Sequence, residues 1–487
     1  MRRLVILLVS SIAVASLRAA PKPADEATVA HVLNRVAFGA RPGDVERVRA
    51  MGIDRYIDQQ LRPDRMADPG MDARLASLTT LRMSSREIAE KIEQPQIEAR
   101  KAKKEGEPPT PLDQRANSVL IELSQQKVLR AVYSERQLQE VLTDFWFNHF
   151  NVDARKGPVR FMLPEYEREV IRPHVLGKFH DLLEADAKSP AMLFYLDNWM
   201  SADPNGPHAR IPPPRIARGP FGPVLVQPAA RPPAQNANAP KGLNENYARE
   251  LMELHTLGVD GGYTQKDVTE VARCFTGWTI DKPRAGGGFV FRPALHDEGR
   301  KVVLGHVLKA GGGESDGEQV LDILAKHPAT ANFIATALAR RLVSDTPPAT
   351  LVARAAKRFR DTDGDLREVT RTILTSPEFL AAEAVDAKAK TPFEFLVSAL
   401  RATGADVQDA LPVVRTVQQL GMPLYQCQPP TGYKDTADAW INTGALVDRM
   451  NFAVRLANGR VNGVTAARDE APDDLALRLG GPEFQRK

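Results

Sequence analysis

At 487 residues the chain is long enough for two or three packed units, or for one large helical body with insertions. Its hydrophobic content of 43% and charged content of 26% are ordinary for a folded globular protein, and the formal net charge is only +4. Because the basic residues are interleaved with acids and form no concentrated stripe, the composition argues against a nucleic-acid-binding protein.

The N-terminus has the pattern of a signal peptide. Arg2 and Arg3 precede an apolar stretch from Leu4 to Leu17, which is too short to span a bilayer. The small residues Ala-Val-Ala at 13–15 offer a cleavage site. We therefore predict a signal peptide over residues 1–19, a periplasmic or secreted protein, and no transmembrane anchor after cleavage. The alternative interpretation is a buried N-terminal helix.

Helical periodicity dominates the rest of the chain. Apolar residues recur three and four positions apart, and strand signals are few. Ser134 and Pro164 suit the first turns of two helices. Helices are predicted over Thr28–Phe38, from about Ser134, from Pro164 to Pro173, and over Glu318–Leu324, Ala329–Val343, Leu351–Phe359, Leu366–Thr375, Pro392–Thr403 and Ala445–Leu456.

Two short β-rich runs, Phe289–Phe291 and Val302–Leu304, are predicted to form one small hairpin attached to the helical body. No alternating series of strands and helices occurs that would build a parallel sheet. The sequence thus predicts a mainly α protein: a multi-helix globular body with a small β-hairpin and a long Pro-rich insertion.

Composition divides the chain further. Residues 202–241 are crowded with Pro, Ala, Asn and Arg and have little to bury, so we predict a disordered or polyproline-like insertion there. The N-terminal helical region, 24–201, and the region 242–461, which holds the hairpin and the C-terminal helices, are expected to pack as one body. Residues 462–487 are weakly patterned and are predicted to form a flexible tail.

The segment Leu243–Trp278 is the densest in polar residues. On a helical wheel at about 100° per residue, its acids and Arg249 share one half, whereas His255 falls in the middle of the apolar half. Arg249 has Glu245 and Glu253 four residues to either side, which favours ion pairing along the outer face. We therefore expect His255 to point into the protein, away from the acids. Gly258 is expected to close this helix in a left-handed conformation, and Thr264 with Asp267 to cap the next helix.

His149 lies at the centre of the apolar stripe of the helix that begins near Ser134. Two inward histidines on separate helices, His149 and His255, allow two interpretations. They are hydrogen-bonded core residues, or they are ligands of one metal site, because helical bundles build metal sites from facing side chains.

Two further histidines have other patterns. His31 shares the polar face of its helix with Arg35, so it is predicted to lie at the surface unless another element covers that face. His296 is followed by Asp297 between two short strands. This carboxylate would orient the imidazole, join it on a metal, or cap a turn.

Two cysteines, Cys274 and Cys427, also allow two interpretations. They form a disulfide in an oxidising compartment, or they are buried separately as small apolar side chains, since spacing alone does not place them within bonding distance. No GxSxG elbow, Walker loop, Rossmann fingerprint or CxxC pair occurs in the sequence. Their absence argues against the commonest hydrolase, nucleotide-binding and redox families.

Ordered motifs run through most of the chain. They are His31–Arg35 with Phe38-Gly39, Phe145–Phe150, Met192–Asn198, Asn244–Gln265, Thr276–Trp278, Phe291–Asp297, Pro429–Tyr433 and Ala439–Ala453. In this order they resemble the motifs of a bacterial family, the domain of unknown function 1800. The resemblance covers nearly everything except the leader, the Pro-rich insertion and the tail.

The resemblance implies an exported, mainly helical bacterial protein. Members of this family are often encoded beside a second exported family that looks like the sulfatase and alkaline-phosphatase superfamily. The family's motifs coincide with His31, Arg35, His149, Glu250, Glu253, His255, His296 and Asp297.

Our leading functional hypothesis is a metal-assisted hydrolase, in which a metal-bound water is the nucleophile. The metal would be a divalent transition metal such as zinc. The expected ligands are His149, His255, His296, Asp297 and His31, and the expected catalytic residues are Glu250, Glu253 and Arg35. The rival hypothesis is a non-catalytic partner that binds or matures the co-encoded sulfatase- or phosphatase-like protein, and a third is a carbohydrate- or peptide-binding module.

Overall fold

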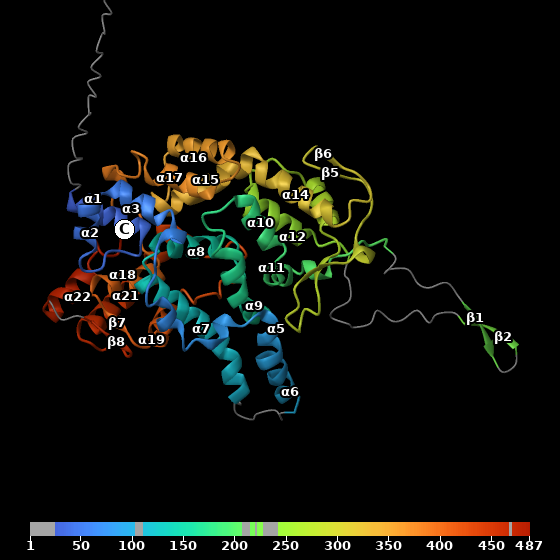
Figure 1. Ribbon diagram of the computed structural model, residues 1–487, viewed down its shortest axis with the longest axis horizontal. Helices are drawn as coiled ribbons and strands as arrows, with labels where there is room; N and C mark the ends of the chain where they lie inside the picture. The colour runs from blue at the N-terminus through green and yellow to red at the C-terminus, as the bar shows by residue number, and fades with distance from the viewer. Residues whose placement is uncertain (1–24, 103–110, 207–214, 220–221, 227–241, 467–469) are drawn as a thin grey trace, which may run out of the picture.

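Most of the chain that the structure describes is helical (Figure 1). The structure is a computed structural model, and it describes residues 25–102, 111–206, 215–219, 222–226, 242–466 and 470–487. The mainly α fold class is confirmed, and within these ranges the strands form only two-stranded antiparallel sheets. The predicted signal peptide and most of the predicted Pro-rich insertion lie outside the described residues.

Most of the expected helices are present, with ends shifted by a few residues. The described helices of eight residues or more are α1 (Glu26–Val36), α2 (Asp44–Met51), α3 (Ile53–Gln60), α6 (Gln94–Ala102), α7 (Pro111–Tyr133), α8 (Gln137–His149), α10 (Phe179–Ala187), α13 (Gln265–Cys274), α14 (Glu314–Lys326), α15 (Pro328–Leu342), α16 (Ala349–Asp361), α17 (Leu366–Leu374), α18 (Pro392–Ala402), α19 (Leu411–Gln419), α21 (Thr443–Ala457) and α22 (Pro472–Gly480).

Two helix starts differ from the expectation. α8 begins at Gln137, because the Gln137 amide donates to the carbonyl of Ser134 and accepts from the backbone N–H of Phe38 instead of capping its own helix. Pro164 does not start a helix but lies inside α9 (Val159–Glu165). Tertiary contacts therefore override both local signals.

Within the described ranges, the helices change to π-helical geometry in three places. These segments are η3 (Ala89–Glu93), η4 (Tyr166–Ile171) and η7 (Leu251–Thr256), and η7 directly continues α12 (Glu245–Glu250). The predicted signature helix is therefore α-helical in its first half and π-helical in its second. π-bulges are rare in proteins, and those that occur often lie at functional sites. The η7 segment therefore makes the region around His255 a candidate functional site.

The prediction that the two β-rich runs form a single hairpin is wrong. Each run pairs with a nearer neighbour: β4 (Phe289–Phe291) with β3 (Trp278–Ile280), and β5 (Lys301–Val303) with β6 (His306–Leu308). Leu304 and its successor Gly305 both have positive φ, and this geometry closes the tight turn between β5 and β6. Within the predicted insertion, β1 (Arg215–Gly219) and β2 (Gly222–Val226) form a further hairpin that the expectation of disorder did not include.

The first and the last helical regions of the described chain pack against each other. Phe38, just after α1, packs edge-on against Phe393 of α18 at 5.4 Å between ring centroids, although more than 300 residues separate them in the sequence. The buried Arg401 of α18 joins these regions, since its guanidinium donates to the carbonyls of Gly39 and Val132 at 2.8 Å each.

The predicted flexible tail is also part of the body. β8 (Val464–Thr465) pairs with β7 (Asp406–Val407), and α22 packs along α21. The last residue, Lys487, exchanges backbone hydrogen bonds with Lys388 and is buried. The expectation failed because the tail's few apolar residues, such as Leu479, find a surface that only the folded body provides.

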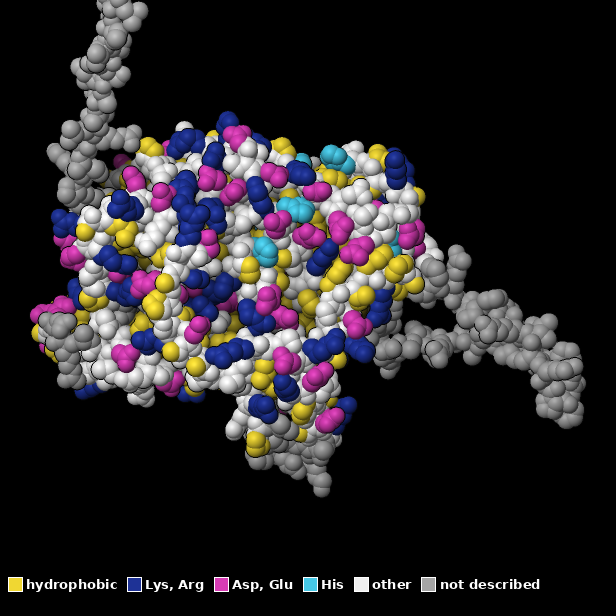
Figure 2. Space-filling model, viewed as in Figure 1, with side chains coloured by type: hydrophobic (Ala, Val, Ile, Leu, Met, Phe, Trp, Pro, Cys, Tyr) yellow, Lys and Arg dark blue, Asp and Glu magenta, His cyan; other side chains and the backbone are white. Residues whose placement is uncertain are grey.

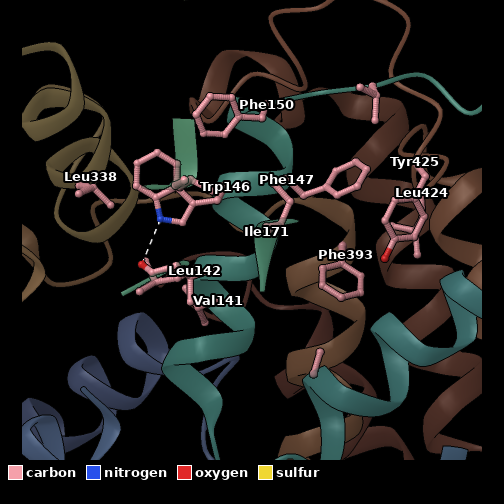
Figure 3. Close-up of a cluster of buried hydrophobic side chains, with 14 of the residues drawn as sticks. Val141, Leu142, Trp146, Phe147, Phe150, Ile171, Leu338, Phe393, Leu424 and Tyr425 are labelled. Atoms are coloured by element: carbon pink, nitrogen blue, oxygen red, sulfur yellow. Dashed lines mark hydrogen bonds between the residues drawn. The ribbon is translucent and has the colours of Figure 1, made fainter. Parts of the chain in front are cut away.

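Buried hydrophobic side chains gather around α8 (Figure 3). Trp146 points toward Leu338 of α15, whereas Phe147 points to the other side, toward Phe393 and Tyr425. Because aromatic side chains of this size are buried, α8 is held firmly in the core. Its C-terminal residues, Asn148 and His149, therefore have fixed positions.

Cys274 and Cys427 are both buried, and neither forms a disulfide. The interpretation as separate small apolar side chains is the one that the structure supports. No helix in the described ranges is both long and apolar enough to cross a membrane.

Candidate functional site

A cleft of about 690 Å³, which we call the His149 cleft, opens at the C-terminal end of α8. Its walls come from α8, the turn after η7, α15 and residues 422–436. The lining includes Lys127, Asp144, Phe145, His149, Leu257, Phe333, Arg341, Tyr425 and Tyr433. This size, with apolar walls and a few converging polar groups, is typical of small-molecule sites.

The turn after η7 folds as its sequence predicts. Gly258 has φ +80°, and a Cβ there would lie 2.9 Å from the Phe333 ring, so only glycine fits this wall of the cleft. Thr264 and Asp267 form the expected capping box of α13. Both predictions are confirmed.

One nitrogen of His149 is fixed and the other is free. Nε2 lies 3.1 Å from the backbone carbonyl of His255, and a carbonyl only accepts, so Nε2 carries the proton and donates. Among the described residues, none donates a hydrogen bond to Nδ1. Burial lowers the pKa of His149 to about 4, so the ring is neutral near pH 7 and its Nδ1 lone pair is available.

A buried cluster lies behind His149. The His255 and His149 rings are 6.4 Å apart between centroids, and His255 points inward as predicted. Its Nδ1 lies 3.8 Å from Asp186 Oδ2, and the Tyr166 hydroxyl donates to Asp186 Oδ1 at 2.7 Å. Burial raises the pKa of Asp186 to about 8 and lowers the pKa of His255 to about 3, so both side chains are uncharged near pH 7.

Residues 427–433, here called the strap, form one wall of the cleft. The Asn148 amide bonds to both the N–H and the carbonyl of Tyr433, at 2.7 and 2.8 Å. Asn151 donates to the carbonyls of Cys427 and Pro429. Gly432 has φ +68°, and a Cβ there would approach the Asn148 carbonyl oxygen to 2.3 Å. The two asparagines of the FNHFN sequence therefore hold the strap in place.

A network of paired charges forms the floor of the cleft. Asp144 bonds to Lys127 at 2.6 Å and to Arg341 at 3.0 Å. Arg341 continues to Glu394 at 2.9 Å, and Glu394 pairs with the side chain of Lys487. On the face shown in Figure 2, Lys and Arg side chains likewise alternate with Asp and Glu, so neither sign covers a wide area.

A second hollow of about 590 Å³, which we call the Glu250 groove, lies on the other side of the strap. Gln428 and Pro430 of the strap line this groove, whereas Thr431 and Tyr433 line the His149 cleft. The strap is thus a shared wall. The other lining residues are Asp153, Arg155, Lys156, Tyr195, Leu196, Asn246 and Glu250.

The expected surface position of His31 is wrong. His31 and Arg35 are 3% and 2% exposed, because residues 376–386 cover the polar face of α1. His31 Nε2 bonds to the Phe379 carbonyl at 2.8 Å, and Arg35 donates to the Ala384 carbonyl at 2.7 Å. Both side chains hold this covering segment and lie in neither hollow.

His296 and Asp297 line neither the His149 cleft nor the Glu250 groove. His296 Nδ1 lies 2.7 Å from the Thr276 carbonyl and its Nε2 lies 3.2 Å from Asp316, which also binds Lys301. Asp297 instead forms a two-point pair with Arg273. Adjacent in sequence, the two side chains have different partners and do not share a site.

The predicted ion pairing along the signature helix is also wrong. Among the described residues, no ion pair within 4.0 Å joins Arg249 to Glu245 or Glu253. Arg249 and Glu245 bond instead to Gln265 of α13, and Glu253 accepts from the Tyr263 hydroxyl at 3.0 Å. Because α13 packs beside this helix, its charged side chains bond to neutral groups. In an isolated helix their only partners would be one another.

The expected metal-binding set does not assemble. Only His149 and His255 come together, and the described ranges hold no group of three or more His, Cys, Asp or Glu side chains that could bind a metal ion. Zinc sites use three or four protein ligands. The side chains present therefore do not fit a zinc centre, and the candidate catalytic residues Glu250, Glu253 and Arg35 have three different surroundings.

Several residues in and behind the His149 cleft have no sequence signal. Asp186 and Tyr166 form one buried pair, and Arg341 and Glu394 form another, but the partners come from separate segments and nothing in their local spacing predicts the contact. The role of Asn148 could have been predicted from the sequence. An amide at the end of an apolar helix stripe is unusual, and if buried it needs a hydrogen-bond partner.

Comparison with known proteins gives a family and no closer relative. The family model described as "Protein of unknown function (DUF1800)" matches residues 31–487, nearly the whole chain. No curated protein and no solved structure matches this chain.

Proposed function

We propose, from the premise that this chain belongs to the DUF1800 family, that it is an exported hydrolase acting in the His149 cleft. One observation carries the proposal. His149 lines a cleft of small-molecule size, and its neutral imidazole is held through Nε2 by the His255 carbonyl, which leaves Nδ1 free. A base in this state can take a proton from a water molecule that attacks a bound substrate.

The His255 carbonyl has the role of an orienting group in this proposal. It accepts the Nε2–H bond, fixes the tautomer, and stabilises the positive charge that forms when Nδ1 takes a proton. The rigid aromatic packing of Trp146 and Phe147 keeps the end of α8 in place. The mechanism runs without a metal step, since the described side chains supply no third ligand.

The first test is a hydrolysis screen with the full chain on chromogenic carboxylic, phosphate, sulfate and glycosidic esters. With any substrate that is cleaved, His149→Ala should lower kcat/KM by about 100-fold or more, because general-base catalysis is worth that much. His180→Ala is the control, since His180 lies on α10 and lines neither hollow. Turnover of no substrate, or full activity of the His149 variant, would contradict the proposal.

A second variant separates this mechanism from metal-assisted hydrolysis. His149 is held by the backbone carbonyl of residue 255, so His255→Gln should keep most of the activity. If the two imidazoles instead bind a metal, the same variant loses both the metal and the activity. Metal content of the purified protein, measured by mass spectrometry, gives the second readout.

A second candidate function is the non-catalytic partner of the co-encoded sulfatase- or phosphatase-like protein. It is favoured by a stripe of exposed apolar side chains on α21, Val447, Met450 and Val454, which lie three and four residues apart. Such a stripe is typical of a docking face. Met450→Glu should then abolish co-purification with that neighbour while leaving hydrolysis unchanged.

A further inference from the structure

We propose that the Glu250 groove binds a protonated primary amine and that the Glu250 carboxylate recognises it. This site is distinct from the His149 cleft, because the strap lies between the two hollows. The proposal therefore does not depend on hydrolysis by His149.

Glu250 is the one lining charge of this groove without a partner among the described residues. Arg155 forms a two-point pair with Asp153, with N···O distances of 2.9 to 3.2 Å. Lys156 is held by Asp197 at 2.8 Å and by the Tyr195 carbonyl. No described residue gives Glu250 a hydrogen bond or an ion pair, so the groove has an uncompensated negative charge.

The surroundings of Glu250 make this charge unfavourable without a ligand. Its carboxyl is half-buried and lies near Glu253. Burial is the larger cause that raises the pKa of Glu250, the negative charge of Glu253 is the smaller one, and Arg249 lowers the pKa. Arg249 is held away by its bond to Gln265. A cation in the groove removes this cost, whereas an anion adds to it.

The other groups of the groove suit the three N–H donors of an ammonium ion. Gln428 and Asn246 bring amide oxygens, and no described residue bonds to either side chain. Tyr195 is fixed, because its hydroxyl donates to the Gln428 carbonyl at 2.7 Å. An ammonium group needs acceptors and a counter-charge at close range, and this groove offers both.

The same amine chemistry is found on amino sugars and on lysine side chains, so the test uses one probe of each kind. The probes are glucosamine and Nα-acetyl-lysine amide, and their N-acetylated forms (N-acetylglucosamine and Nα,Nε-diacetyl-lysine amide) are matched ligands that carry no ammonium. Binding to the full chain is measured by calorimetry and ligand-detected NMR. We expect at least one free amine to bind at least tenfold more tightly than its acetylated form, and the better probe identifies the source.

The variants are Glu250→Gln and, as the matched control, Glu253→Gln. Both remove one negative charge from the same helix, but Glu253 bonds to Tyr263 and does not line the groove. Glu250→Gln should weaken amine binding at least tenfold, and Glu253→Gln should stay within about threefold, with thermal unfolding showing that both are folded. Equal binding of free and acetylated probes, equal effects of the two variants, or no binding of either amine would overturn the proposal.

Discussion

Two buried clusters of titratable side chains lie near the His149 cleft. Both must offset the free-energy cost of burying charge, and they do so in opposite ways. In the network of Asp144, Arg341, Glu394 and Lys487, every charge is kept and paired. In the cluster around Asp186, burial removes the charges, since the pKa of Asp186 rises to about 8. The first cluster depends on attraction between ions and the second on the absence of ions.

The difference follows from the number of opposite charges within reach. Burial disfavours the Glu394 carboxylate, but Arg341 and Lys487 more than offset this and hold its pKa below the ordinary range. The Asp186 carboxyl contacts the Tyr166 hydroxyl and the neutral imidazole of His255, and neither carries an opposite charge. A lone buried carboxylate takes up a proton, whereas a paired one stays ionised.

The largest expected effect is on the paired network. Glu394→Gln leaves Arg341 and Lys487 buried without their shared partner, so the free energy of unfolding should fall by about 3–5 kcal/mol. Urea unfolding at pH 7 measures it. Lys357→Gln, which breaks the exposed pair with Asp361, is the control and should leave the unfolding midpoint unchanged. A Glu394 variant as stable as the parent would mean that pairing is not what retains the charge.

The second effect is a loss of stability in acid. Burial lowers the pKa of His255 to about 3, below the value of about 6.5 in the unfolded chain, so its stabilising contribution is complete above pH 6.5 and is lost as the pH falls toward 3. The slope is at most about 1.4 kcal/mol per pH unit, or about 2 kcal/mol between pH 6.5 and 5. His255→Gln should reduce the slope by this amount, and an unchanged slope would show that His255 is not buried in its neutral form.

The third effect tests the hydrogen bond that Asp186 accepts. Tyr166→Phe removes the hydroxyl that lies 2.7 Å from Asp186 Oδ1 and 2.8 Å from the Phe150 carbonyl, and it leaves these buried oxygens without that partner. This should lower the free energy of unfolding by about 1–2 kcal/mol. Tyr263→Phe is a comparable change at a more exposed hydroxyl and should cost less. A larger cost for the Tyr263 variant would contradict this ranking.

At pH 5 the smallest effect is expected from Asp186→Asn. Asp186 is protonated at pH 5, and asparagine keeps an acceptor for Tyr166, so the free energy of unfolding should stay within about 1 kcal/mol of the parent. Because the pKa of Asp186 is raised, its contribution to stability is present at low pH and is lost as the pH rises through about 8. The variant should therefore become the more stable protein at pH 8, and a strong loss at pH 5 would show that Asp186 is ionised.

Sequence reasoning succeeded where the cause is local. Gly258 closes its helix, Thr264 and Asp267 cap the next one, and the helices of the C-terminal half follow from their apolar spacing. The inward position of His255 also follows from periodicity, although the helix changes to π geometry before it.

Sequence reasoning failed where a residue from a distant segment determines the position or the partner of a side chain. His31 was expected at the surface, but a segment more than 340 residues away covers it. Arg249 was expected to pair within its helix, but Gln265 of α13 is the partner it finds. A helical wheel contains only one helix, so it cannot show what packs on the polar side.

By itself, the sequence determined the mainly helical class, the family motifs and the presence of inward histidines, because these depend on the period of apolar residues and on local backbone preferences. The tertiary structure decided which of these side chains share a site. It set His149 against the His255 carbonyl, placed Asp186 behind them, and put Glu250 in the groove across the strap with no partner among the residues that are described. Such contacts join residues far apart in the chain, and only packing in three dimensions fixes their distances and their charge states.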